Sequence, residues 1–488
     1  MRSLGDLLRF LRGRDDGIKR RAVRAGLWVG VSGAVWNLMS LLRSVVLARL
    51  LTPEIFGIWA ICMTLNRGMT VFSETGFASA LIQRKERAEE ARDTAFTLLI
   101  LRGAMLCLIT IAAAPLFSGF YELAILQPLI SVLAIAFLIS GFHNINTILQ
   151  QKELQYHRLA MLDQLTIVLG FVFVVAVAYY YRSAWALVAG HVFTAAITVV
   201  LSYLIIPGRP RLAFNKKLAS ELFHYGKFVG GAGIVAFITL ELDNLVIGKV
   251  LGMEALGLYA VAYMLANLPA TQLAKVISGV MLPAYSKLQS DIPALRAAYQ
   301  RTLAFVSMLT IPATVGLGVL APQIVGVIYG EHWMPAVDAL RVLAAFGCLR
   351  SIGVLSGYMY NAIGKPKISF YFTLAKLAVI GATIYPLTVA YGIVGAAVGV
   401  TLPSLITFFV DFVVLRRIIG LDIRAAMLPL LRTFLFSALM AAVLLLMQPY
   451  LGQISLLSLA ASILTGFLAY AALAWRDMHR MYTWITSR

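Results

Sequence analysis

Two arginines, Arg43 and Arg67, interrupt stretches of the sequence that are otherwise apolar. An ionised side chain at the centre of a membrane costs roughly 2.5–3.5 kcal/mol on insertion scales, so it is expected to face water, a ligand or a charged partner. A guanidinium group stays charged at cellular pH and binds phosphate oxygens through two parallel hydrogen bonds. Both side chains are therefore candidates for binding an anionic group, and a structural ion pair is the alternative for each.

Thr70 and Glu74 follow Arg67 at helical spacing. The three side chains form one polar stripe on a predicted helix, directed at protein or water rather than at lipid. A pairing of Arg67 with Glu74 between neighbouring helices explains the stripe equally well. Lys275 is the candidate cation of a later apolar stretch, where the alternative is a side chain that extends to the cytoplasmic face.

Two acidic residues, Glu241 and Asp243, lie in a further apolar stretch. A carboxylate in this position needs a cation or a proton to compensate its charge. We therefore expect Asp243 to pair with a cation elsewhere in the protein, or one of the two carboxyl groups to take up a proton and couple it to a second process.

A further stripe of polar side chains stands at helical spacing in the fourth apolar stretch and comprises His143, Asn146, Thr147 and Gln150. We expect it to line a path for a polar substrate, and a hydrogen-bonded seam between helices is the alternative. Arg350 is aligned with His143 by an internal repeat described below, and we assign it to the same path.

Other charged residues lie nearer the ends of apolar stretches. Arg102, Lys376 and Arg432 are within about two turns of the predicted cytoplasmic side, and we expect their long side chains to extend to the membrane surface. Asp411 precedes Arg416 by about one turn, and we expect local compensation of its charge.

The sequence shows no pattern typical of an enzyme or a metal site. The three cysteines, Cys62, Cys107 and Cys348, fall inside apolar runs without ligand spacing, so they are expected to be packing residues. No Gly-rich phosphate loop or pairing of a nucleophile with a base is evident. We therefore expect no catalytic activity, no cofactor and no metal.

The composition identifies the class of protein to which these residues belong. The 488 residues are 60% hydrophobic and only 13% charged, with a mean hydropathy of +0.86. A membrane-spanning helix needs roughly 20 apolar residues. We therefore predict about fourteen spans, at 27–48, 55–80, 95–117, 124–149, 159–180, 184–206, 228–248, 255–281, 302–328, 338–362, 369–390, 394–415, 427–448 and 454–475.

The basic residues indicate how these spans are oriented. Lysines and arginines concentrate at the N-terminus and in alternate loops, so the positive-inside rule places both termini in the cytoplasm. The net charge of +19 is explained by this topology, and we expect no binding to nucleic acid. The location predicted is a multi-pass position in a bacterial inner membrane.

An internal repeat relates two parts of the chain. Residues 43–67 align without a gap to residues 243–267, with Gly57 on Gly257 and Arg43 on Asp243. A second match aligns His143 with Arg350. We therefore predict an all-α polytopic membrane protein, with two pseudo-symmetric lobes of about six helices each around a central cavity.

The predicted limits are a basic cytoplasmic segment 1–26, a first lobe 27–206, a linker 207–227, a second lobe 228–415, two C-terminal helices within 427–475 and a cytoplasmic tail 476–488.

Five segments together resemble one family of transporters. Residues 47–57 (LARLLTPEIFG) and 74–86 (ETGFASALIQRKE) are similar to the first two helices of Wzx-type oligosaccharide flippases. So are residues 149–154 (LQQKEL), 282–289 (LPAYSKLQ) and 329–333 (YGEHW). The resemblance covers nearly the whole chain and is strongest to the colanic acid exporter type, within the multidrug/oligosaccharidyl-lipid/polysaccharide export superfamily.

This resemblance implies a function and a site. The implied function is the transfer of polyprenyl-diphosphate-linked oligosaccharides across the inner membrane, with a cation-coupled multidrug exporter of the same superfamily as the alternative. Lipid II flippases of the superfamily receive the diphosphate in a cationic cavity, and the spacing of Arg43 and Arg49 resembles that of arginines there. Membrane lipids are further expected partners, as are the polysaccharide polymerase and the export machinery.

The resulting assignment has three groups. The diphosphate-binding residues are Arg43, Arg49, Arg67 and Lys275. Residues for coupling or ion pairing are Glu74, Glu241 and Asp243. Residues on the path of the glycan are His143, Asn146, Gln150 and Arg350.

The repeat generates a first prediction. If Arg43 and Asp243 form an ion pair that the substrate phosphate breaks, the losses of transport in Arg43→Ala and Asp243→Ala are not additive. A double-mutant cycle on the transport rate measures this coupling, which is commonly about 0.5–3 kcal/mol for residues in one network. Strictly additive losses would reject the pairing.

Overall fold

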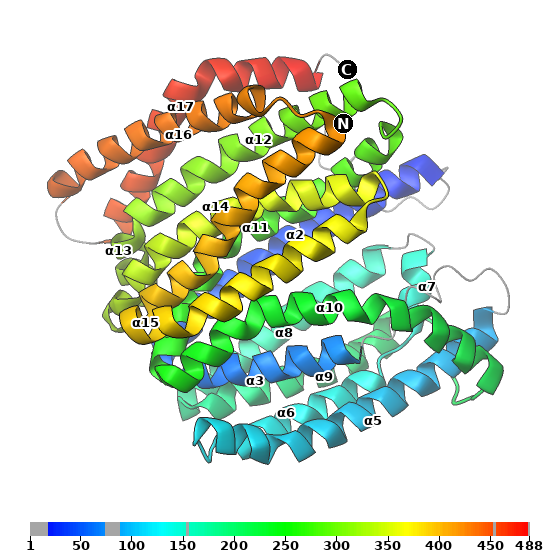
Figure 1. The fold of residues 1–488 in the computed structure, drawn as a ribbon. Helices are drawn as coiled ribbons and strands as arrows, with labels where there is room; N and C mark the ends of the chain where they lie inside the picture. The colour runs from blue at the N-terminus through cyan, green and yellow to red at the C-terminus, as the bar shows by residue number, and fades with distance from the viewer. Residues whose placement is uncertain (1–17, 74–87, 153–155, 452–454, 487–488) are drawn as a thin grey trace, which may run out of the picture. The chain divides into compact units, whose positions relative to one another are not determined.

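The computed structural model describes residues 18–73, 88–152, 156–451 and 455–486. For some of these residues, including 219–232 and 272–280, it describes the backbone alone. In the described residues the regular elements are all helices (Figure 1). They are α2 (Ile18–Leu50), α3 (Pro53–Phe72), α5 (Ala88–Tyr121), α6 (Leu126–Gly141), α7 (Asn146–Lys152), α8 (Tyr156–Tyr181), α9 (Ala184–Ile205), α10 (Lys216–Val250), α11 (Met253–Lys287), α12 (Ile292–Val319), α13 (Ala321–Ile324), η1 (Val325–Tyr329), η2 (Glu331–Ala336), α14 (Val337–Ala362), α15 (Pro366–Ile419), α16 (Ile423–Met447), η3 (Gln448–Leu451) and α17 (Leu456–Thr486).

Many of these helices have the length and composition of membrane spans. Among the described residues, ten helical segments are long and apolar enough to cross a membrane, and α6 is a shorter apolar helix. The prediction of an all-α polytopic membrane protein is therefore confirmed. The number of about fourteen spans stays a prediction.

The segment α15 consists of two helices joined at a sharp turn. A single helix of 54 residues is about 80 Å long, far more than the roughly 30 Å of hydrocarbon in a membrane. Tyr391 and Gly392 leave the helical conformation, and Gly392 takes a φ of +60° that favours glycine. The chain reverses here, between the predicted spans 369–390 and 394–415 (Figure 1).

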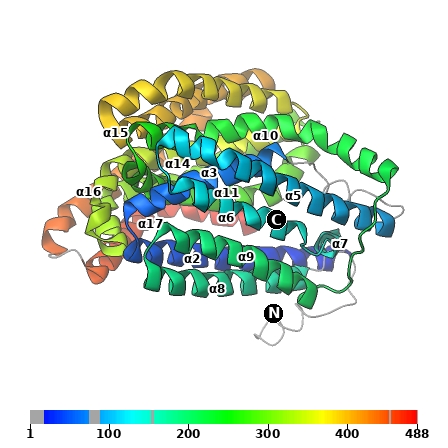
Figure 2. The ribbon, with the colours of Figure 1, turned by 90° about the horizontal axis from the view of Figure 1, so that it is seen from below.

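The chain forms two compact units. Unit 1 contains residues 1–51 and 61–237, and unit 2 contains residues 52–60 and 238–488. In unit 1, α5 packs on α6 and α8 packs on both α2 and α9 (Figure 2). In unit 2, α14 packs on α11, α12 and α15, and α16 packs on α12 and α17. The predicted limits of the lobes, 27–206 and 228–415, stay predictions.

The predicted span 124–149 is interrupted in the structure. Helix α6 ends at Gly141, and α7 begins at Asn146 after a turn. Asn144 stands in this turn, where its Oδ1 accepts a hydrogen bond from the backbone N–H of Asn146 at 3.1 Å. Its amide also donates to the carbonyl groups of Ser202 and Gly208 at 3.3 and 3.0 Å. Asparagine often bonds to the backbone in this way, which competes with continuation of a helix.

The predicted span 302–328 lies too far towards the C-terminus. Helix α12 already begins at Ile292, because Asp291 caps it by accepting a hydrogen bond from the backbone N–H of Ala294 at 3.0 Å. Pro293 in the first turn is also compatible with a helix start. The helix ends at Val319, ahead of Pro322.

Helices α3 and α11 cross closely near their starts in unit 2. A Cβ atom at Gly57 would lie 1.8 Å from the carbonyl oxygen of Met253, and one at Gly257 would lie 1.8 Å from that of Pro53. The contact is reciprocal, since the residues aligned by the repeat exchange roles. Small residues at such crossings allow the backbones of membrane helices to approach. Beside it, the rings of Phe56 and Trp333 meet edge to face at 5.0 Å, which joins two of the segments that carry the family resemblance.

A second prediction follows from this crossing. Gly257→Ala forces the two backbones apart, and overpacking of this kind costs about 1–3 kcal/mol of stability. The apparent melting temperature of the purified protein in detergent measures the effect. Gly357→Ala in α14 is the matched control, because a Cβ atom there meets nothing within 4 Å. Equal melting temperatures for the two variants would show that the crossing is not tight.

Candidate functional site

Unit 1 contains a polar cavity among its apolar helices. The cavity has a volume of about 270 Å³ and lies between α3, α5, α6 and α9. Its polar lining comes from Asn66, Thr70, Arg102, Ser140 and His191. Amide, hydroxyl and guanidinium groups that converge on one space suit a polar, anionic ligand rather than a lipid chain.

Arg102 is the cation of this cavity, and α5 positions it against the end of α3. Its Nε and Nη2 donate to Ser73 Oγ at 3.1 and 2.9 Å. Nη2 also donates to the carbonyl oxygen of Thr70 at 3.3 Å, which accepts a second hydrogen bond from the Ser73 hydroxyl at 3.0 Å. The side chain is half-buried, and its extension to the membrane surface stays a prediction.

Close packing of α5 on α6 keeps the cavity walls together. A Cβ atom at Gly103 would lie 2.5 Å from the carbonyl oxygen of Phe137, and one at Gly141 would lie 2.9 Å from that of Leu99. All four residues line the cavity. The backbones of both helices are thus close enough to place Arg102 and Ser140 on the same space.

Arg43 acts on the same region from α2. Its side chain is half-buried, and its charge interacts electrostatically with the imidazole of His191, which lines the cavity. Within the described residues of unit 1, no carboxylate forms an ion pair with Arg43. The sequence thus predicted one cation of this region, and the structure adds a second cation, Arg102, and the imidazole of His191.

The other predicted phosphate ligands are placed differently. Arg49 is exposed near the end of α2, and Arg67 is exposed on α3, where its Nη2 donates to Thr64 Oγ1 at 3.4 Å. Glu74 lies outside the described residues, so the pairing with Arg67 stays a prediction. Lys275 belongs to α11, but its side chain is outside the description.

The predicted acidic residues form a hydrogen-bonded group in unit 2. Asp243 is only 3% exposed, and it accepts hydrogen bonds from the Tyr259 hydroxyl at 2.7 Å and from the backbone N–H of Asn244 at 2.9 Å. The Asn244 amide also donates to Glu241 Oε2 at 3.0 Å. Hydrogen bonds to an ionised carboxylate stabilise it where water is scarce.

Arg350 is held against α11 on the same side of unit 2. Its Nη1 donates to Asn267 Oδ1 at 3.0 Å and to the hydroxyl of Tyr263 at 3.3 Å. The rings of Tyr259 and Tyr263 are 6.0 Å apart. A carboxylate and a guanidinium group are therefore connected through two neighbouring tyrosines of one helix.

A second acidic group in unit 2 differs from the expectation. Asp411 accepts a hydrogen bond from the hydroxyl of Tyr360, and its charge interacts with that of Lys376. Lys376 also interacts with the charge of Arg350 and is half-buried. Lys376 thus takes the compensating role that we expected of Arg416.

The stripe assigned to the glycan path takes part in packing. Asn146 is buried, and its amide donates to Asn144 Oδ1 at 2.9 Å. His143 is half-buried in the turn after α6, and Gln150 is buried with its Oε1 unpartnered among the described atoms. These contacts fit the alternative of a hydrogen-bonded seam. A role of these residues or of Arg350 on the glycan path stays a prediction.

Comparison with known proteins identifies the family. Residues 46–338 match the family described as polysaccharide biosynthesis protein. The chain belongs to this family. The match includes Arg49, Arg67, Arg102 and His191.

Several curated members of the family are similar along most of their length. The lipopolysaccharide biosynthesis protein WzxC of Escherichia coli K12 is 27% identical, over 86% of both chains. The teichuronic acid biosynthesis protein TuaB of Bacillus subtilis is 25% identical, over 82% of this chain and 85% of its own. The succinoglycan biosynthesis transport protein ExoT of Rhizobium meliloti is 26% identical, over 70% and 69%. The resemblance to Wzx-type flippases is confirmed.

Solved structures confirm the fold of the superfamily. The lipid II flippase MurJ in an inward closed conformation superimposes with a TM-score of 0.76 at 16% identity, covering 93% of this chain and 99% of its own. An inward-facing multidrug resistance transporter of the MATE family gives a TM-score of 0.65 at 18% identity, covering 79% and 94%. At these identities the likeness concerns the fold alone.

A third prediction tests whether the cavity of unit 1 contains water. In a chain whose three cysteines are replaced by alanine, Ser140→Cys should react with a charged, water-soluble thiol reagent at least about tenfold faster than Leu138→Cys, because the reactive thiolate forms only where water solvates it. Ser140 lines the cavity, whereas Leu138 is exposed on another face of α6. The labelled fraction after a fixed time measures the difference. Equal reactivity at both positions would argue against a wet cavity.

Proposed function

We propose that this chain moves a polyprenyl-diphosphate-linked oligosaccharide from the cytoplasmic to the outer leaflet by alternating access, for exopolysaccharide or O-antigen biosynthesis. The names of its relatives support this, because they are polysaccharide biosynthesis and transport proteins from different bacteria. Transport requires no chemical step on the substrate.

The observation that carries the proposal is the basic, polar cavity among the apolar helices of unit 1. The headgroup of such a lipid carries a diphosphate and a glycan, which both have to cross hydrocarbon, while the prenyl chain stays in the membrane. A cavity lined by a guanidinium group, hydroxyl groups and an amide replaces the water that phosphate loses. Arg102 lies in this cavity and Arg43 lies beside His191.

We assign the diphosphate to Arg43 and Arg102 first. Arg43 has no carboxylate partner within the described residues of unit 1, and Arg102 is held by uncharged groups of α3. Arg102 lines the cavity and Arg43 interacts with His191 of its lining, and guanidinium groups placed in this way attract an anion. Arg49, Arg67 and Lys275 remain further candidates as the substrate moves.

The carboxylates of unit 2 are our candidates for coupling. Asp243 is buried, and a change in its charge would alter its hydrogen bond with Tyr259. Either a proton at Asp243 or Glu241, or an ion pair of Asp243 with Arg43 in one state of the cycle, would link transport to a driving force. Glu74 retains the same proposed role.

A cation-coupled drug exporter is the less favoured alternative. A cavity for cationic amphiphiles is expected to contain carboxylates, whereas the described lining of the unit 1 cavity contains Arg102 and His191 and no acidic side chain.

We further propose that both termini lie in the cytoplasm, as the basic loops indicate. Cooperation with a polymerase and export machinery belongs to the same proposal.

A fourth prediction tests the proposed function. In proteoliposomes with a labelled polyprenyl-diphosphate oligosaccharide, Arg43→Gln and Arg102→Gln should each lower the flipping rate at least about tenfold, because a hydrogen bond to a charged group contributes about 1.5–3 kcal/mol. Arg417→Gln is the control, since Arg417 is exposed at the end of α15. Absence of flipping by the unaltered protein would contradict the function. Full flipping by both variants would contradict the site alone.

A further inference from the structure

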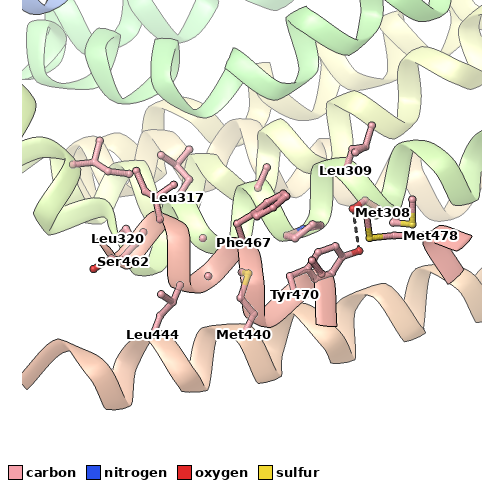
Figure 3. Close-up of a pocket in the computed structure, with 17 residues that line it drawn as sticks. Met308, Leu309, Leu317, Leu320, Met440, Leu444, Ser462, Phe467, Tyr470 and Met478 are labelled. Carbon is pink, nitrogen blue, oxygen red and sulfur yellow. Dashed lines mark hydrogen bonds between the residues drawn. The ribbon is translucent and has the colours of Figure 1, made fainter. Parts of the chain in front are cut away.

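An apolar groove runs along the C-terminal helices of unit 2. It has a volume of about 380 Å³ and lies between α12, α16 and α17 (Figure 3). Its lining combines larger apolar side chains such as Leu317 and Phe467 with small residues, among them Ala313, Gly316, Gly466 and Ala471. Such a groove accommodates a flexible hydrocarbon chain rather than a polar molecule.

A second cavity with a different character adjoins this groove. Its volume is about 480 Å³, and its lining includes Arg301 of α12, Arg432 and Thr433 of α16, and Asp477 of α17. Among the residues of this lining, two arginines thus stand with one carboxylate. Since both arginine side chains are exposed, their guanidinium groups are accessible to a ligand.

The two spaces meet at one hydrogen bond. Met308 and Tyr470 line both of them, and the Tyr470 hydroxyl donates to the carbonyl oxygen of Met308 at 3.0 Å (Figure 3). A ligand that fills both spaces therefore has an apolar part and an anionic part, joined near Tyr470.

The dimensions match a lipid of a single leaflet. Arg301 and Arg432 each stand nine residues after the first residue of their helices, so they lie at similar depth. From Met308 to Leu320 the groove extends about 18 Å along α12. This is close to one leaflet of hydrocarbon, which is half of about 30 Å.

We propose that the groove and the adjoining cavity bind an anionic glycerophospholipid of the surrounding membrane. One acyl chain occupies the groove beside Gly316, and the phosphate accepts hydrogen bonds from Arg301 and Arg432. Basic pockets between membrane helices on the cytoplasmic side are typical sites for acidic lipid headgroups. The bound lipid fills the space between α12, α16 and α17 and thereby stabilises the attachment of the last two helices to the rest of unit 2.

The transported lipid is a different occupant. A polyprenyl chain is much longer than an acyl chain, and the groove extends over about one leaflet. The site lies in unit 2, and the proposal does not depend on the function assigned to the cavity of unit 1.

Lipid retention by the purified full-length chain tests the proposal. We expect native mass spectrometry to show preferential retention of dioleoyl phosphatidylglycerol over dioleoyl phosphatidylcholine. Arg432→Gln should weaken phosphatidylglycerol binding about fivefold, the effect of one basic residue near an anionic surface. The control is Arg424→Gln, because Arg424 is exposed in the first turn of α16 and does not line the cavity.

A second pair of variants tests the groove. A Cβ atom at Gly316 meets only the tip of Met440 at 3.7 Å, so Gly316→Leu should fill the groove and reduce the binding of both phospholipids. Gly318→Leu is the control on the same helix, since a Cβ atom at Gly318 meets nothing within 4 Å. Equal retention of the two lipids, or unchanged phosphatidylglycerol binding in both Arg432→Gln and Gly316→Leu, would overturn the proposal. Tighter binding of undecaprenyl phosphate than of phosphatidylglycerol would also overturn it and would assign the groove to the prenyl chain.

Discussion

The cost of holding a guanidinium group among apolar helices is the constraint on which the rest of this structure depends. In unit 1, the guanidinium group of Arg102 donates hydrogen bonds to uncharged groups, the Ser73 hydroxyl and the carbonyl oxygen of Thr70 near the end of α3. The same guanidinium group also lines the cavity of unit 1, where positive charge attracts an anion. Unit 2 also binds a guanidinium group, that of Arg350, through the uncharged side chains of Asn267 and Tyr263, but it places the carboxylate of Asp243 on the neighbouring Tyr259. The two units thus differ in what they offer to an anion.

Much of the fold was predictable because hydrophobic length and helix packing leave local traces in a sequence. The turn at Gly392 falls between two predicted spans, and the aligned glycines Gly57 and Gly257 meet in one reciprocal crossing. The errors arose where a polar side chain changed the backbone. Asn144 ends α6 early by bonding to α9 and the residues after it, and Asp291 caps α12 before its apolar part begins.

The site was less predictable, because it depends on which helices pack together. Arg43 could be selected by its depth in an apolar stretch. Arg102 could not, since its partner Ser73 lies 29 residues away and only the packing of α3 and α5 brings them together. The interaction of Lys376 with Asp411 was missed for the same reason, since the sequence offers the nearer Arg416 as a partner. A residue's distance from the end of an apolar run therefore gives little information about its contacts.

The central claim is that positive charge in unit 1 receives the anionic headgroup of a lipid during transport. The most direct measurement is a structure of the protein in a lipid bilayer with a polyprenyl-diphosphate oligosaccharide bound. The account predicts diphosphate density within hydrogen-bonding distance of Arg43 or Arg102. Diphosphate bound only in unit 2, with the cavity of unit 1 closed and dry, would contradict it.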